Sequence, residues 1–317
     1  MDDFKQYIKS VTEINDRKIY TVADHMTGFD ENYNNPLLDY ISNNGNNDHA
    51  VINYEHFLPN SIKQKYNNLE INFSLDRYDK KLLGPLLSYN TTLVEKNKIE
   101  NFLCCFLGKD HVSRQFLSAI LIKSNIWNSE YCRKDFSYTS DSLDGNISFY
   151  LNHEESRLYR KFFVSNTADI NFRKNTIGYE HGDNVHNLKV IDNYFKKSFL
   201  ALIPETIGTS FIPFITEKFL NAVVTKTLFV TYGQPNWHST LENVHGFKLH
   251  NKIFDYSFDK IQNPIHRVIK LFEMISKFQH LSAADWHDLY LIEQDTIEYN
   301  YDHYYSKNYL KYLAKFA

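Results

Sequence analysis

A Thr-Glu-Lys triplet in the second half of the chain carries residue types that could bind an anion. It follows an apolar run and precedes a stretch with helical period, residues 217–227. Thr216 is a typical N-cap residue, and Glu217 suits the first helical turn because the helix dipole is positive there, whereas Lys218 does not. An anionic ligand at the helix start would remove this conflict by accepting hydrogen bonds from free N–H groups and pairing with the lysine. The alternative is a surface lysine whose small energetic cost is tolerated.

The composition narrows the class of protein. The chain has 317 residues, 43% of them hydrophobic and 23% charged, as in an ordinary globular protein. Its net charge of −3 gives no broad basic field for a nucleic-acid backbone, which leaves only a local basic groove for such a partner.

The N-terminus lacks a signal-peptide pattern, and no apolar run approaches the roughly 20 residues that span a bilayer. We therefore expect a cytoplasmic protein with no transmembrane segment.

The cysteines and histidines do not indicate a metal site. Cys104, Cys105 and Cys132 have neither zinc-site spacing nor the pattern of a disulfide framework. Buried free thiols in a reducing compartment are expected. The histidines between residues 236 and 250 show no recurring ligand spacing, so we interpret them as structural and predict no metal.

Apolar runs that alternate with helical periodicity indicate an α/β protein with mainly parallel sheets. Strands are predicted over residues 18–23, 50–54, 69–74, 101–107, 199–203 and 228–232. Helices are predicted over residues 114–124, 217–227 and 264–278. The polar stretch 170–187 is predicted as a long loop.

The chain divides into two predicted lobes and a tail. A polar stretch without helical period, residues 89–97, places a boundary near residue 93. The N-terminal lobe would comprise residues 1–93 and the C-terminal lobe residues 94–280. Residues 281–317 are predicted as a helical tail, since aromatic residues and lysines recur at helical spacing over residues 301–317. Such a tail could lie on a membrane surface, but we expect it to pack back on the N-terminal lobe.

Two patches in the donor half resemble the signature of α1,3-fucosyltransferases. The first is residues 96–106, followed by Arg114-x-x-Leu117-Ser118. The second runs through residues 197–205, the triplet 216–218, the pair Asn221-Ala222 and the strand 230–235, which closes on Gly233. In the family, the second patch contains a Phe-Glu-Asn strand end, a Thr-Glu-Lys helix start and an Asn-Ala pair.

A third patch, upstream, is similar to the acceptor-lobe run of the same family. Residues 51–60 place Glu55 just after a strand and end in Pro-Asn, and residues 73–78 contain a Phe-Asp stretch. The order of all three patches matches the family. The chain departs from it at Pro204-Glu205-Thr206, where the family has Phe-Glu-Asn, and in the spacing of Asn221. These departures indicate a distant member similar to bacterial and phage glycosyltransferases, so the identity of the donor sugar does not transfer.

The resemblance implies a fold, a reaction and residue roles. The fold would be GT-B, two Rossmann-like lobes facing a cleft. The reaction would be inverting transfer of a sugar to a glycan hydroxyl, with fucose from GDP-fucose as one candidate. Lys218, the helix start behind Thr216 and Arg114 would stabilise the leaving diphosphate. Glu217 would bind the ribose hydroxyls, and Glu205 would orient the donor or bind sugar hydroxyls. The alternatives are that Glu217 is an ordinary residue of the first helical turn, that Arg114 is a surface arginine and that Glu205 is a loop carboxylate.

Glu55 is the candidate general base implied by the family match. Its position just past a strand is where α/β proteins place reactive groups. A general base needs a pKa raised toward neutrality and reach to the acceptor hydroxyl. The neighbouring Tyr54 and Phe57 could desolvate the carboxylate. His56, His25, Asp24 and Asp30 are the alternatives.

No metal or cofactor is expected, because the nucleotide sugar is a substrate and the cationic groups could hold its diphosphate alone. The donor half has no Asp-x-Asp motif, and Asp255 and Asp259 have the wrong spacing for one. Two other functions remain open. One is a phage-type enzyme that modifies hydroxymethylated DNA bases, which the acidic net charge disfavours. The other is a non-catalytic nucleotide-sugar or glycan-binding relative, which the lost asparagine after Glu205 favours.

Overall fold

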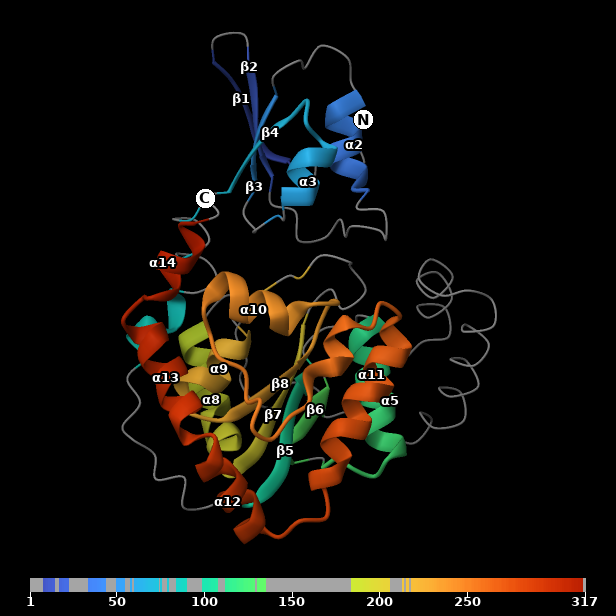
Figure 1. Ribbon diagram of the computed structural model, residues 1–317, viewed down its shortest axis with the longest axis vertical. Coiled ribbons are helices and arrows are strands. Elements are labelled where there is room, and N and C mark those ends of the chain that lie inside the picture. Colours follow the sequence, from blue (N-terminus) through green and yellow to red (C-terminus); the bar gives the residue numbers. More distant parts are fainter. Residues whose placement is uncertain are drawn as a thin grey trace.

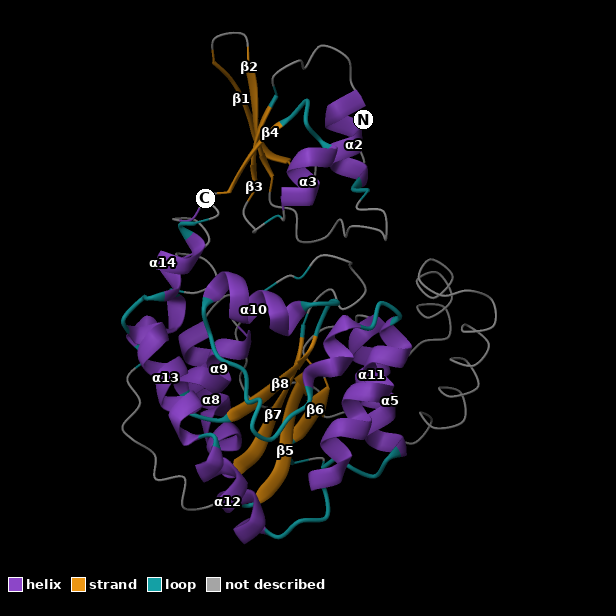
Figure 2. Ribbon diagram, viewed as in Figure 1, coloured by secondary structure: helices purple, strands orange, loops and turns teal. Residues whose placement is uncertain are grey.

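A computed structural model describes most of both halves of the chain. The described residues are 8–14, 17–22, 34–43, 50–54, 58, 60–73, 75, 79, 84–89, 99–107, 112–128, 130–134, 184–205, 213, 215–216 and 218–315. Within them the protein is a mixed α/β structure with two four-stranded sheets (Figures 1 and 2). The α/β class predicted from the sequence is confirmed.

The first sheet has the order β1-β2-β3-β4. Its strands are β1 (Ile8–Ile14), β2 (Arg17–Val22), β3 (Val51–Tyr54) and β4 (Glu70–Phe73). β1 and β2 are antiparallel, and the other neighbours are parallel. Helices α2 (Pro36–Asn43) and α3 (Asn60–Lys65) lie on the same side of this sheet (Figure 1) and share a buried core with it.

Three elements of this sheet region, β1, α2 and α3, escaped the sequence prediction. In β1 the apolar residues Ile8, Val11 and Ile14 recur every three positions, which conceals the period of a strand. The start of α2 does carry a signal. The Asn35 side chain accepts from the backbone N–H groups of Leu37 and Leu38, both at 3.0 Å, and Pro36 occupies the first helical position.

The second sheet is parallel throughout and has the order β6-β5-β7-β8. Its strands are β5 (Asn101–Leu107), β6 (Cys132–Lys134), β7 (Ser198–Pro204) and β8 (Leu228–Tyr232). β7 and β8 are buried along their whole length, which explains their continuous apolar runs. The ranges predicted for β5 and β8 agree with the structure residue for residue. The three cysteines are buried and free, as predicted.

Helices cover both faces of the second sheet (Figure 1). α5 (Val112–Lys123) and α11 (Pro264–Ile275) pack on one face, and α8 (Asn184–Lys197) and α9 (Lys218–Val224) pack on the other. Because α5 follows β5 and α8 precedes β7, the chain changes faces between these two strands. The sheet therefore has a topological switch point where the carboxyl ends of β5 and β7 meet.

Helix α8 begins inside the stretch predicted as a loop, so the predicted end of that loop is wrong. The loop was expected to reach residue 187, but the helix begins at Asn184. Its buried residues Leu188, Ile191 and Phe195 recur at three and four positions, which is the spacing of a helix that packs on one face. Residues 170–183 lie outside the described part of the chain.

The C-terminal residues wrap around the second sheet as short helices. Those that follow β8 are α10 (Trp237–His245), η3 (Tyr256–Lys260), α11, η4 (Ser276–Phe278), α12 (Ala283–Ile292), α13 (Gln294–Tyr305) and α14 (Tyr309–Leu313).

The end of this tail contacts earlier parts of the chain. Lys307 and Tyr309 donate to the carboxylate of Asp79, and the Tyr305 hydroxyl donates to the carbonyl of Tyr89, just after η2 (Pro85–Ser88). The boundary predicted near residue 93 lies outside the described residues. Among the described helices, none is long and apolar enough to cross a membrane.

Candidate functional site

A carboxylate, a hydroxyl and an ammonium meet at the carboxyl end of β7. Glu205 is the first residue after this strand, and its backbone N–H donates to the carbonyl of Tyr232 on β8 at 3.0 Å, which extends the ladder. Ile203 packs on the face that α8 and α9 cover. Because side chains alternate along a strand, Glu205 belongs to that same face. It thereby reaches Thr216 and Lys218, where α9 begins.

The three side chains form a connected set of hydrogen bonds, which we call the Glu205–Lys218 cluster. The Thr216 hydroxyl donates to Glu205 Oε2 at 2.8 Å and Oε1 at 3.0 Å, and the Thr216 backbone N–H donates to Oε1 at 3.2 Å. Lys218 Nζ donates to Glu205 Oε2 at 3.3 Å and to Thr216 Oγ1 at 2.9 Å. The carboxylate of Glu205 is therefore the acceptor that both residues share.

Thr216 also serves the helix that follows. Its Oγ1 accepts from the backbone N–H of Lys218 at 3.4 Å, two residues on, as an N-cap residue does. The hydroxyl therefore donates once, to the glutamate, and accepts twice from the lysine. This pattern fixes the direction of the hydroxyl and ties the start of α9 to the end of β7.

The cluster alters the argument made from the sequence about Lys218. An outside anion was one way to relieve the conflict between the lysine and the helix dipole, and the buried carboxylate of Glu205 relieves it instead. The side chain of Lys218 is 25% exposed, whereas that of Glu205 is 0% exposed. Among the described residues, two of the three N–H donors on Nζ are engaged. Within this part of the chain, no acceptor is found for the third donor.

Glu205 is placed differently from both sequence expectations. Its carboxylate is buried and accepts from Thr216 and Lys218, so it is not a solvated loop carboxylate. The same contacts turn it inward, away from solvent. Its predicted contact with the donor or its sugar would require these contacts to open.

Arg114 lies at the same edge of the sheet, in the first turn of α5, just after β5. It is 5% exposed, so the surface-arginine alternative is wrong. Burial raises the pKa of the nearby Cys105 thiol well above its usual value, and the charge of Arg114 opposes this rise. Arg114 and Lys218 thus follow the two strands, β5 and β7, that flank the switch point.

Two predicted site residues, Glu55 and Glu217, lie outside the described residues. So do the alternative bases His25, His56, Asp24 and Asp30. Glu55 directly follows β3, which ends at Tyr54.

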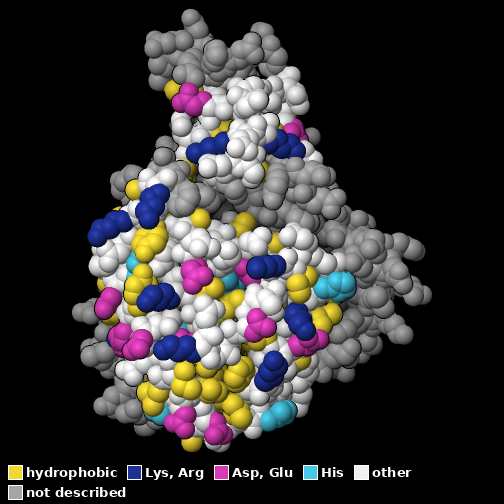
Figure 3. All heavy atoms as spheres, in the orientation of Figure 1, with side chains coloured by type: hydrophobic (Ala, Val, Ile, Leu, Met, Phe, Trp, Pro, Cys, Tyr) yellow, Lys and Arg dark blue, Asp and Glu magenta, His cyan; other side chains and the backbone are white. Residues whose placement is uncertain are grey.

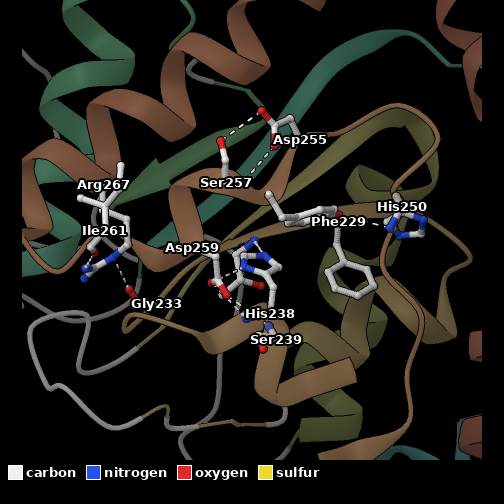
Figure 4. Close-up of polar contacts among 12 residues, drawn as sticks. Phe229, Gly233, His238, Ser239, His250, Asp255, Ser257, Asp259, Ile261 and Arg267 are labelled. Atoms are coloured by element: carbon white, nitrogen blue, oxygen red, sulfur yellow. Dashed lines mark hydrogen bonds and ion pairs between the residues drawn. The ribbon is translucent and has the colours of Figure 1, made fainter. Parts of the chain in front are cut away.

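A second polar cluster surrounds the start of α10, next to β8 (Figure 4). His238 Nε2 accepts from the backbone N–H of Thr231 at 3.1 Å, so Nδ1 carries the proton and donates to Asp259 at 2.8 Å. Asp259 also accepts from the backbone N–H groups of His238 and Ser239, both at 3.1 Å. Burial would raise the pKa of Asp259, but the bonds from His238 and Ser239 outweigh it and hold the pKa below its usual value.

The contacts of this second cluster hold the start of α10 against β8. Asn236 precedes α10 with a left-handed backbone and no cap from its own side chain, so Asp259 caps the helix instead. Thr231 N–H lies on the outer edge of β8, the last strand of the sheet, and His238 satisfies it. A histidine with both nitrogens engaged in this way is not poised to move a proton.

Arg267 fixes the loop after β8. Its side chain is buried, and Nε donates to the carbonyl of Gly233 at 3.0 Å. Nη1 donates to the carbonyls of Ile261 at 2.6 Å and Gln262 at 2.9 Å (Figure 4). A Cβ on Gly233 would lie 2.8 Å from the Trp237 ring, which explains why this strand closes on glycine.

Sequence reasoning gave Asp259 no capping role and left Arg267 unassigned. Asp259 lies 21 residues from His238, so no local pattern links them. The position of the arginine could be predicted, since Asn263-Pro264 marks a helix start and Arg267 lies in the first turn.

Among the described residues, no group of three or more histidine, cysteine or acidic residues could hold a metal ion.

The chain shows no significant match to any protein-family model, curated protein or solved structure.

Proposed function

We propose that this chain is an inverting glycosyltransferase of the GT-B arrangement. It would move a sugar from a nucleotide donor to a glycan hydroxyl. The observation that carries the proposal is the position of the Lys218 ammonium. It lies beside the switch point of a parallel sheet, it is partly exposed, and one of its N–H donors has no acceptor among the described residues. Open α/β sheets bind their ligands at such points.

The chemistry of sugar transfer suits this arrangement. The leaving nucleoside diphosphate gains negative charge in the transition state, so a fixed cation near it stabilises the transition state more than the ground state. Lys218 supplies that cation, and Arg114 is the second candidate from the other side of the switch point. Glu217 binds the ribose hydroxyls in this account. The α9 helix has only seven residues, so we assign the binding to the side chain of Lys218 and not to the helix dipole.

The first sheet supplies the acceptor side in this proposal. Glu55 follows the parallel strand β3 and acts as general base, taking the proton of the acceptor hydroxyl as it attacks the anomeric carbon. The C–O bond to the diphosphate breaks as the new glycosidic bond forms. Attack from the face opposite the leaving group inverts that carbon. The contacts of the tail with Asp79 and Tyr89 link the acceptor side to the donor lobe.

A thermal-shift screen of GDP-, UDP-, CMP- and dTDP-sugars tests the proposal. A ligand at a hundredfold its dissociation constant adds about 2.7 kcal/mol to the free energy of unfolding. We expect GDP-linked sugars to raise the melting temperature of the wild type and of the control variant Lys270→Met. Lys270 is an exposed residue of α11 paired with Glu273. No shift with any nucleotide sugar would contradict the proposal.

Catalysis is tested separately from binding. We expect slow hydrolysis of the GDP-sugar that is lost in Glu55→Gln while nucleotide binding stays intact. The same assay in a chelator should keep its rate, since the proposal uses no metal. A rate that stops in chelator and returns with manganese would contradict that part.

One observation favours a second candidate, a nucleotide-sugar-binding protein without turnover. The residue after Glu205 departs from the pattern of the fucosyltransferases, and Glu205 itself is turned inward by Thr216 and Lys218. Binding without hydrolysis or transfer, with every donor and with added glycans, would support this candidate. For the DNA-modifying alternative we find no such support: on the face in Figure 3, basic and acidic side chains are interspersed.

A further inference from the structure

The Glu205–Lys218 cluster places a negative charge directly behind the cation of the proposed donor site. Glu205 Oε2 lies 3.3 Å from Lys218 Nζ, and the glutamate is 0% exposed, so solvent screens it weakly. We propose that Glu205 is a positioning residue that limits how tightly Lys218 holds a diphosphate, and so allows the product to leave. This inference rests on the proposed function.

The sign of the effect follows from the distances. A phosphate that accepts from the remaining N–H of Lys218 would lie on the far side of the ammonium, at roughly 6 Å from the carboxylate. Two like charges at that separation repel appreciably at the effective dielectric constant of about 20 that applies near protein surfaces. Removing the carboxylate charge should therefore tighten binding of an anion.

An opposing effect is that the ammonium of Lys218 loses one of the two acceptors that orient it. Glutamine offers one acceptor oxygen where the carboxylate offers two, and its amide group would face Lys218. The two bonds from Thr216 can still converge on that oxygen, so the end of β7 keeps its shape. Lys218 keeps its bond to Thr216 Oγ1. We expect the gain in anion affinity from the lost repulsion to exceed the loss from the poorer orientation of Lys218.

The measurement is the dissociation constant of GDP, by calorimetric titration, for four proteins. Wild type and Glu205→Asp both keep the negative charge, and we expect their constants to agree within about threefold. Glu205→Gln should bind GDP about tenfold more tightly at low salt, with a smaller gain as salt rises, because the effect is one of charge. Glu205→Gln/Lys218→Met should lose most of the affinity.

The outcomes separate this inference from the proposed function. If the wild type binds none of GDP, UDP, CDP and dTDP, the proposed function fails and this inference fails with it. If the wild type binds GDP and Glu205→Gln binds it equally or more weakly, only this inference is overturned.

Folding of the single variant is checked by its melting temperature. If Glu205→Gln does not fold, the dissociation constant of GDP is compared between Glu205→Gln/Lys218→Arg and Lys218→Arg. The same tenfold gain is expected there, and equal affinity would overturn the inference.

Discussion

The ends of β7 and β8 lie side by side in one sheet, yet their polar clusters differ in kind. At the end of β8, His238, Asp259 and Arg267 are buried and satisfy one another or the backbone. At the end of β7, Glu205 is buried but its partner Lys218 reaches solvent. In our proposal only the second of these clusters takes part in chemistry. A cluster that closes on itself holds a loop, and one that keeps a donor toward solvent can hold a ligand.

Lys218→Met should have the largest effect on stability. It leaves the carboxylate of Glu205 buried without its cation, and breaking a buried pair in this way costs about 3–5 kcal/mol. Urea unfolding measures the loss. The double variant Glu205→Gln/Lys218→Met should recover most of it, because both charges are gone. If the double variant is no more stable than Lys218→Met, Glu205 does not depend on this lysine as its counter-charge.

Acid should destabilise the folded protein through His245, the last residue of α10, at the end of the helix opposite the cluster at β8. Burial lowers the pKa of this histidine to about 4, below the value near 6.5 of an unfolded chain. The folded protein then binds fewer protons than the unfolded one between these values, so stability is full above about pH 6.5 and falls toward pH 4. The loss from this group reaches about 3 kcal/mol at pH 4.

Urea unfolding at several pH values measures this acid effect. His245→Gln, which cannot titrate, is the matched variant. Its stability should fall less steeply between pH 6.5 and 4 than that of the wild type. Equal slopes would show that His245 is not the group responsible.

Asp259→Asn should cost about 2 kcal/mol. The amide keeps the size of the carboxylate but loses charge-assisted bonds to His238 and to the first N–H groups of α10. Nucleotide affinity should stay within about twofold of the wild type, since this cluster faces no ligand in our account. A large loss of GDP affinity without unfolding would move the donor site toward β8.

Thr216→Val should have the smallest effect on stability, about 1 kcal/mol. It removes the hydroxyl that caps α9 and bonds both Glu205 and Lys218, but leaves the ion pair in place. GDP affinity should fall a few-fold because the lysine loses one of its two restraints. Thr216→Ser restores the hydroxyl and should behave as the wild type in both measurements.

The sequence predicted three of the four strands of the second sheet, β5, β7 and β8, for a physical reason, and missed the three-residue strand β6. Strands buried on both faces are continuous apolar runs, and β5 and β8 could be bounded by their polar ends. It did not predict β1, because that edge strand depends on pairing with β2 and not on its own pattern. The helix α8 was hidden by the polar stretch that precedes it, although its apolar residues do recur at helical spacing.

The candidate site was predictable only in part. Thr216 and Lys218 belong to a local motif, so their proximity follows from the sequence. The contact of Glu205 with both arises because the end of β7 meets the start of α9 across 11 residues of chain. No spacing rule specifies such a contact. The same holds for Asp259, whose role in capping α10 depends on where η3 lies.

The central claim is that the ammonium of Lys218 contacts the diphosphate of a nucleotide-sugar donor. A crystal structure of the wild type with GDP tests it most directly. The account predicts a diphosphate oxygen within about 3.2 Å of Lys218 Nζ, at the carboxyl ends of β5 and β7, with Glu205 still bound to Thr216. A diphosphate bound elsewhere, with Lys218 still directed only at Glu205 and Thr216, would contradict the account.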